Sequence, residues 1–269
     1  MTRLIAAVFF MFSLAAGTAY TQPLPTNPAG VTMGHWHLNV RDVEASKKIF
    51  IAMGGKAVKA GAAEVVEFPG VVIRFMNPGV TPPTAGTVGS VINHVGFMVK
   101  DVQGSMAKWK AAGVPVVPGN NGRLDQAYVN MPDGLRIEIL EDKTQAMPIR
   151  NEHVHFSLTE AEIPKMQAWY AKTFGGKAYM RNNAPVVDIP GVQLRFAKAD
   201  AAAPTTKGRV LDHIGFDVKN LQAFLKKFEA DGGKIARPYT KNEQAGTALA
   251  FIYDPWGTYI ELNERPTTL

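Results

Sequence analysis

The chain has 269 residues and a formal net charge of +6, and it contains no cysteine. The lack of cysteine excludes disulfides, thiolate nucleophiles and cysteine-ligated metals. The positive charge is spread out and forms no basic run with interleaved aromatic residues, so nucleic acid is not an expected partner. A chain of this length suits one large or two ordinary domains.

The first residues have the features of an export signal. A short basic start, Met1-Thr2-Arg3, precedes an apolar run from Leu4 to Ala16, and Gly17-Thr18-Ala19 offers small residues for cleavage. The run is short for a bilayer span. We predict a signal peptide over 1–19, an extended leader over 20–32, and a periplasmic or secreted mature protein with no stable membrane anchor. A retained N-terminal anchor is the alternative.

Four similar segments follow, and each opens on a strand that carries histidine. The strands are predicted at 34–40, 93–99, 152–158 and 212–218, and all six histidines of the chain lie in them. Side chains alternate between the two faces of a strand, so His35, His37 and Asn39 share one face, and Trp36 and Leu38 lie on the other. Such a strand suits a sheet that is curved around a polar cavity and backed by helices.

Each histidine strand is followed by a helix and further strands. Polar N-cap residues precede predicted helices at 43–53, 102–112, 160–174 and 221–231, and glycine follows each helix. Strand-like runs come next, so each unit reads as βαβββ. The four units are predicted at 33–77, 90–143, 150–198 and 209–266.

The units alternate in type, which indicates a duplicated pair. Units one and three carry His-x-His and a Pro-Gly-Val turn at 69–71 and 190–192, whereas units two and four carry a single histidine and a Pro-x-Gly turn at 132–134 and 255–257. We therefore predict two tandem domains, 33–145 and 150–266.

The last strands of units two and four place a glutamate among the inward histidines. Glu138 and Glu261 each lie between two apolar residues that face the other way, and a carboxylate on an inner face needs a partner. The spacing along the chain groups the candidate metal ligands as His35, His94 and Glu138, and as His153, His213 and Glu261. Two imidazoles and a carboxylate suit Fe(II), Mn(II) or Zn(II) and leave coordination positions open, as catalytic sites do. A hydrogen-bonded core histidine is the alternative.

Three further side chains are candidate catalytic residues. His37 and His155 lie two residues beyond a predicted ligand on the same face and could be extra ligands, ligand-orienting groups or proton carriers. We predict an orienting or acid–base role. Tyr128 lies in the strand before Glu138 and could supply a phenol, with packing as the alternative.

Arginine takes the last-strand position in units one and three. Arg74 and Arg195 are predicted to face inward, where each either binds a substrate anion or pairs with a carboxylate such as Glu67 or Asp188. The sequence leaves these two roles open.

At this point the sequence resembles the vicinal-oxygen-chelate (VOC) superfamily of glyoxalase I, bleomycin-resistance and fosfomycin-resistance proteins and extradiol dioxygenases. The segments that carry the resemblance are 211–216 and 254–262. The resemblance implies an α+β fold in which four βαβββ units form two tandem cupped-sheet domains. It also implies metal ligation by the first-strand histidine of each unit and by both glutamates. Glyoxalase-type sites have a fourth metal ligand at the last-strand position of Arg74 and Arg195, so arginine there is a departure. Extradiol dioxygenases have a tyrosine near the glutamate. Tyr128 matches that tyrosine in the first domain, whereas Phe251 replaces it in the second.

The resemblance leads us to expect a divalent-metal-dependent enzyme whose substrate binds the ion through vicinal oxygens. A glyoxalase-type lyase or isomerase and an extradiol-type dioxygenase are not distinguished, and a metal-free binding protein of the bleomycin-resistance type is the alternative. A third reading has one active pair of units and one structural pair. Zn, Fe(II), Mn and Ni all fit, with export favouring Zn. We expect a small, anionic substrate. A homodimer stays open, as does whether paired units meet within one chain.

Overall fold

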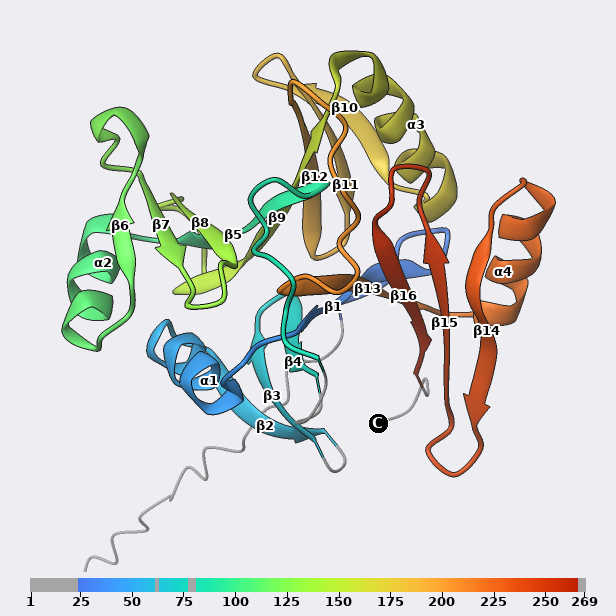
Figure 1. Ribbon diagram of the computed structural model, residues 1–269, viewed down its shortest axis with the longest axis horizontal. Helices are drawn as coiled ribbons and strands as arrows, with labels where there is room; N and C mark the ends of the chain where they lie inside the picture. The colour runs from blue at the N-terminus through green and yellow to red at the C-terminus, as the bar shows by residue number, and fades with distance from the viewer. Residues whose placement is uncertain (1–23, 61–62, 77–80, 266–269) are drawn as a thin grey trace, which may run out of the picture.

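The computed structural model describes residues 24–60, 63–76 and 81–265, and within them the four predicted units are all present (Figure 1). The first unit has β1 (Val31–Leu38), α1 (Val43–Ala52), β2 (Lys56–Ala60), β3 (Ala63–Phe68) and β4 (Val71–Phe75). The second has β5 (Ile92–Val99), α2 (Val102–Ala111), β6 (Val116–Pro118), β7 (Gln126–Asn130) and β8 (Arg136–Glu141). The predicted signal peptide lies outside the described residues.

The third unit has β9 (Ile149–Leu158), α3 (Ile163–Phe174), β10 (Lys177–Arg181), β11 (Ala184–Ile189) and β12 (Val192–Lys198). The fourth has β13 (Leu211–Val218), α4 (Leu221–Ala230), β14 (Ile235–Asn242), β15 (Thr247–Tyr253) and β16 (Tyr259–Glu264). Asp42, Asp101 and Asn220 cap their helices through side-chain oxygens. Thr159 does not, because a short 3₁₀ turn precedes α3.

The strands form two eight-stranded mixed sheets, which confirms the predicted fold class. One sheet has the order β14-β15-β16-β13-β1-β4-β3-β2, and the other has the order β10-β11-β12-β9-β5-β8-β7-β6. Unit one therefore shares a sheet with unit four, and unit two shares a sheet with unit three. The expectation that consecutive units share a sheet was wrong, because β1 pairs antiparallel with β13 and β5 with β9. These paired units meet within one chain.

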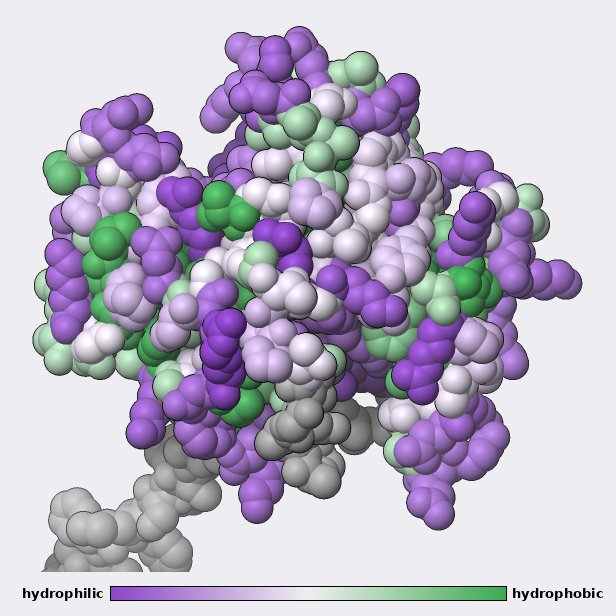
Figure 2. Space-filling view, viewed as in Figure 1, coloured by the Kyte–Doolittle hydropathy of each residue, from purple (hydrophilic) through white to green (hydrophobic). Residues whose placement is uncertain are grey.

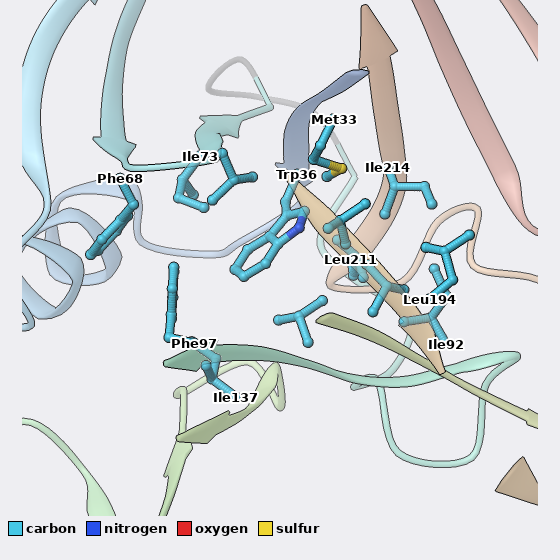
Figure 3. Close-up of a cluster of buried hydrophobic side chains, with 14 of the residues drawn as sticks. Met33, Trp36, Phe68, Ile73, Ile92, Phe97, Ile137, Leu194, Leu211 and Ile214 are labelled. Carbon is cyan, nitrogen blue, oxygen red and sulfur yellow. The ribbon is translucent and has the colours of Figure 1, made fainter. Parts of the chain in front are cut away.

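Each half of the chain is held together on the helix-covered side of its strands. Phe68 packs on Phe97 with ring centroids 4.5 Å apart, which joins units one and two, and Phe174 packs on Phe216 at 4.5 Å, which joins units three and four. Trp36 packs on Phe97, with ring centroids 5.1 Å apart, in the buried cluster of Figure 3. Units one and two thus pack together through their cores, as do units three and four, whereas each sheet joins strands from both halves of the chain. The domain boundaries 33–145 and 150–266 stay a prediction.

The two Pro-Gly turns connect the two sheets. The carbonyl of Pro69, after β3, accepts a hydrogen bond from the backbone of Asn151 in β9, and the carbonyl of Pro190, after β11, accepts one from Met33 in β1, both at 2.8 Å. Gly70 and Gly191 have φ of 91° and 88°, which favours glycine at these turns. The turns that mark units one and three in the sequence therefore fix the sheets relative to each other.

Hydrophilic residues predominate on the face drawn in Figure 2, and its apolar residues lie in small separate groups. None of the described helices combines the length and the apolar character that crossing a membrane requires.

Candidate functional site

The histidines and glutamates converge in two groups, one in each sheet. We call them centre A, formed by His35, His37, His213 and Glu261, and centre B, formed by His94, Glu138, His153 and His155. Within each centre the four ligand atoms lie within 4.8 Å of one another. All six predicted metal ligands are included, but the predicted grouping was wrong, because the units pair as one with four and two with three.

Complementary sequence motifs allow the two first strands of each sheet to approach. His35 is opposite Gly215 in the β1–β13 ladder, and His153 is opposite Gly96 in the β5–β9 ladder. A β-carbon on either glycine would lie 2.0 Å from Cε1 of the facing histidine. The His-x-His strand of one unit therefore needs the His-x-Gly strand of its partner.

The donor atoms of centre A are close to one carboxylate oxygen. Oε2 of Glu261 lies 2.9 Å from Nε2 of His213 and 3.2 Å from Nε2 of His35. Nδ1 of His37 lies 3.0 Å from Nε2 of His213 and 4.0 Å from the same carboxylate oxygen. The structure thus places His37 among the donors.

Centre B repeats this arrangement. Oε2 of Glu138 lies 3.1 Å from Nε2 of His153 and 3.3 Å from Nε2 of His94. Nε2 of His153 and Nδ1 of His155 are buried and have no hydrogen-bond partner among the described residues. His155 corresponds to His37, and it also lies among the donors.

A β-bulge precedes the first histidine of every unit. The ladders skip Gly34, Asn93, Glu152 and Asp212. A bulge residue leaves the strict alternation of faces, so its side chain can reach the ring of the histidine that follows.

These bulge residues fix the histidine rings through Nδ1. Nδ1 of His213 is 2.6 Å from Oδ1 of Asp212, Nδ1 of His94 is 2.9 Å from Oδ1 of Asn93, and Nδ1 of His153 contacts Oε2 of Glu152. Gly34 has no side chain, and Nδ1 of His35 is buried without a partner among the described residues. Sequence reasoning missed these groups because simple alternation assigns them to the opposite face. The signal in the sequence was a polar residue directly before the first histidine of three of the four units.

The ionisation of the centres suits cation binding. Burial by itself raises the pKa of Glu138 and Glu261, but contacts with the facing histidines outweigh it and hold both pKa values far below the ordinary range. Burial lowers the pKa of His35 to about 3, and it also lowers the pKa of His94 and His155.

In centre A, His213 departs from this pattern. Burial lowers its pKa, but hydrogen bonds to Asp212 and Glu261 outweigh burial and leave it raised.

Comparison with known proteins relates part of this chain to a family. A family model described as the Glyoxalase/Bleomycin resistance protein/Dioxygenase superfamily matches residues 153–262, which lie in units three and four. This segment therefore belongs to the superfamily. A search of curated proteins finds no match.

Solved structures of a glyoxalase I and a putative dioxygenase share the fold of the chain. Glyoxalase I from Zea mays is 17% identical with a TM-score of 0.68, and the alignment covers 87% of this chain and 92% of that one. A putative dioxygenase from Bacillus subtilis subsp. subtilis str. 168 is 12% identical with a TM-score of 0.61, and the alignment covers 87% and 85%. At these identities the likeness shows the fold alone.

The donors of the two centres fit a divalent cation. In the tautomer of neutral His94 whose Nδ1 donates to Oδ1 of Asn93, Nε2 presents a lone pair to the Glu138 carboxylate 3.3 Å away. Two lone pairs that face each other repel unless a cation lies between them. Three imidazoles and one carboxylate are suitable ligands for such an ion. Each centre can therefore hold one divalent metal.

Arg195 pairs with a different carboxylate from the predicted one. Its Nη2 donates to Oε1 of Glu152, and its Nε donates to Oε1 of Gln193 at 3.0 Å. Nη1 of Arg181 also donates to Glu152, at 3.2 Å. The predicted partner Asp188 instead accepts from Gln193 at 2.9 Å. The bulge that turns Glu152 inward explains the difference.

Arg74, the counterpart of Arg195, has a different environment. Its buried Nε has no hydrogen-bond partner among the described residues. The nearby carboxylates are Asp217 and Glu261, and Asp217 forms an ion pair with Arg265 at 3.1 Å. Because Gly34 stands where the other sheet has Glu152, Asp217 takes up that space.

The residue that faces the glutamate from the neighbouring strand distinguishes the two centres. The Tyr128 hydroxyl donates to Oε1 of Glu138 at 3.3 Å and accepts from Asn120 and Gln126, each at 3.1 Å. Phe251 takes the Tyr128 position opposite Glu261 in centre A. The predicted tyrosine is therefore at the site in centre B, and centre A has an apolar ring there.

Proposed function

We propose that this chain is a divalent-metal-dependent enzyme acting on a small substrate that binds the ion through two neighbouring oxygens. The supporting observation is the set of four convergent side chains in each sheet, three imidazoles around one ionised carboxylate. The match of residues 153–262 to the superfamily model supports the same function. A bound divalent ion would act as a Lewis acid that stabilises an enediolate-like or catecholate-like anion.

We assign the substrate chemistry to centre B. Burial, together with the Glu138 charge, raises the pKa of Tyr128, so the phenol keeps its proton at neutral pH. That O–H, 3.3 Å from Glu138, can instead donate a hydrogen bond to a substrate oxygen and stabilise negative charge that develops there. Phe251 cannot do this in centre A.

This proposal changes the roles predicted for two histidines and selects between the two roles left open for each arginine. His37 and His155 serve as ligands rather than proton carriers, because a ring nitrogen of each lies within the donor groups. Arg195 positions Glu152 and so has little capacity for a substrate anion. Arg74, with an unpartnered Nε, is the better candidate to hold one.

Turnover assays distinguish the reaction types. Catechols tested with an oxygen electrode reveal a dioxygenase through oxygen uptake, and α-hydroxycarbonyl compounds reveal an isomerase or lyase through a change in carbonyl absorbance. We expect turnover by one route, its loss in His94→Ala, and its retention in a Lys165→Ala control, which changes an exposed residue of α3. A purified protein that binds no metal and turns over neither class would instead support the non-catalytic binding alternative.

We further propose a periplasmic or secreted location and a zinc ion. Outside the cytoplasm an apoprotein binds the metal that competes best, and Zn²⁺ binds more tightly than Fe²⁺ or Mn²⁺. N-terminal sequencing of protein from its native host tests export, with a start shortly after residue 19 expected. Elemental analysis of the same sample tests the metal, and iron or manganese in place of zinc would contradict this choice.

A further inference from the structure

A cavity of about 800 Å³ lies beside centre B, and its lining includes polar residues of β9, β10 and β12. The four donors of centre B do not line it. Glu152 belongs to both places, because it lines the cavity and contacts Nδ1 of His153. The cavity is therefore a neighbouring site that the Glu152 carboxylate separates from the centre.

One buried side chain in the cavity has an unused acceptor. Asn151 is 3% exposed, and its Nδ2 donates to the carbonyl of Gly191 at 2.7 Å. Its Oδ1 has no hydrogen-bond partner among the described residues. Buried polar atoms are nearly always paired, but this oxygen has almost no accessible surface, so it can accept from an O–H or N–H donor of a ligand only after the Asn151 side chain shifts toward the cavity.

Two arginines of the lining have unused donors. Arg181 bonds Glu152 and Gln193 through Nη1, which leaves its Nε and Nη2 without a partner among the described residues, and its side chain is 40% exposed. Arg150 uses Nη1 on the carbonyl of Asn151 at 3.3 Å. Guanidinium groups with free N–H donors are suited to bidentate binding of a carboxylate.

The carboxylates of the lining already have protein partners. Glu152 accepts from His153, Arg181 and Arg195, and Asp188 accepts from Gln193. Asp142 accepts from the backbone and hydroxyl of Thr144 at 2.9 and 2.6 Å. The unused groups are thus mainly arginine donors and the Asn151 acceptor.

Beside centre A, the described residues line a much smaller cavity. The corresponding cavity beside centre A has a volume of about 70 Å³ and is lined by Met33, Gly34 and Arg265. Met33 and Gly34 stand at the positions that Asn151 and Glu152 occupy in β9. The two sheets have the same fold but differ at these positions, so the larger cavity and the Asn151 acceptor are specific to the sheet of centre B.

We propose that the cavity binds an organic acid that carries an O–H or N–H donor beside its carboxylate and has an apolar portion. The carboxylate binds Arg181, the donor binds Oδ1 of Asn151, and the apolar portion contacts Met98 and Met147. Pockets of this size hold molecules larger than a simple two- or three-carbon acid. The proposal does not depend on a metal in centre B.

Calorimetric titration of the mature protein tests this site. The probes are phenyllactate and phenylalanine, and 3-phenylpropanoate is the control that keeps the carboxylate and the ring but lacks the donor. We expect saturable binding of one equivalent of at least one probe, with 3-phenylpropanoate weaker by roughly tenfold or more. Phenyllactate and phenylalanine distinguish a hydroxy acid from an amino acid.

Three variants locate the binding. Arg181→Gln and Asn151→Met, which copies Met33, are each expected to weaken binding by roughly tenfold or more. Arg265→Gln, which changes the small cavity of the other sheet, leaves it unchanged. Arg181→Gln alters a partly exposed side chain, so it decides the question if Asn151→Met does not fold. Absence of binding to folded protein, or equal binding by Arg181→Gln and the unmodified chain, would overturn the proposal.

Discussion

Replacing Gly96 by alanine tests the packing of centre B. Gly96 lies under the His153 ring, and an added β-carbon would be 2.0 Å from Cε1 and 2.3 Å from Nδ1. The φ of Gly96 is outside the positive range, so the cost is steric. The ring must move by about 1.4 Å or more to reach ordinary contact at 3.4 Å.

This movement exceeds what a metal site tolerates, because ligand distances hold within about 0.2 Å. His153 is fully buried, so its ring can move only by displacing its neighbours. We therefore expect Gly96→Ala to lose the ion of centre B and to cost about 1–3 kcal/mol of stability through overpacking. For a chain of this size that corresponds to a fall in Tm of about 2–12 °C.

Metal analysis and thermal unfolding measure both effects. Gly215→Ala is the matched control, because it makes the same 2.0 Å contact with His35 and is expected to empty centre A alone. The double variant is expected to hold no ion. Full metal content and an unchanged Tm in Gly96→Ala would refute the packing argument.

Three other predictions follow from the centres. Tyr128→Phe removes the O–H donor beside Glu138 and is expected to lower kcat by about 100-fold or more with metal content unchanged; equal kcat would exclude the tyrosine from the reaction. Glu152→Gln removes the carboxylate charge that contacts Nδ1 of His153 and is expected to weaken metal binding in centre B by about 10- to 100-fold. Asp212→Asn is expected to do the same in centre A, and unchanged affinity in equilibrium dialysis would argue against this role. Chelator treatment is expected to lower the free energy of unfolding by about 2.7 kcal/mol per site, relative to protein at a free-ion concentration 100-fold above Kd, and denaturant titrations that coincide would contradict it.

The repeated elements were predictable because their signals are local. Asp42 and Asp101 cap helices, and Gly113 has the positive φ of a helix C-terminus. Such features depend on neighbouring residues, so one sequence suffices to detect them. The six candidate ligands were predictable because all histidines lie in the first strands and because Glu138 and Glu261 each lie between apolar residues of a last strand. Their role as metal ligands stays a prediction.

The pairing of the units was not predictable from sequence spacing. Equal distances along the chain suggested that His35 meets His94, but the β1–β13 ladder brings it to His213. The available clue was steric: a ring at His35 needs a partner strand with glycine, which both Gly96 and Gly215 provide. Two candidates fit equally well, and only the folded sheet selects between them.

The groups behind the ligands were missed because bulges break strand alternation. Glu152 and Asp212 point toward the histidines only because the ladders skip them. The partner of Arg195 was assigned wrongly for the same reason. A one-residue change in register thus decides which carboxylate meets the guanidinium.

Metal stoichiometry of paired histidine variants tests the central claim most directly. If each centre joins units across the chain, His35→Ala with His213→Ala empties centre A and leaves one ion per chain, whereas His35→Ala with His94→Ala leaves none after dialysis. One ion retained by the second pair and none by the first would contradict the assignment, as would an unmodified protein that binds no ion.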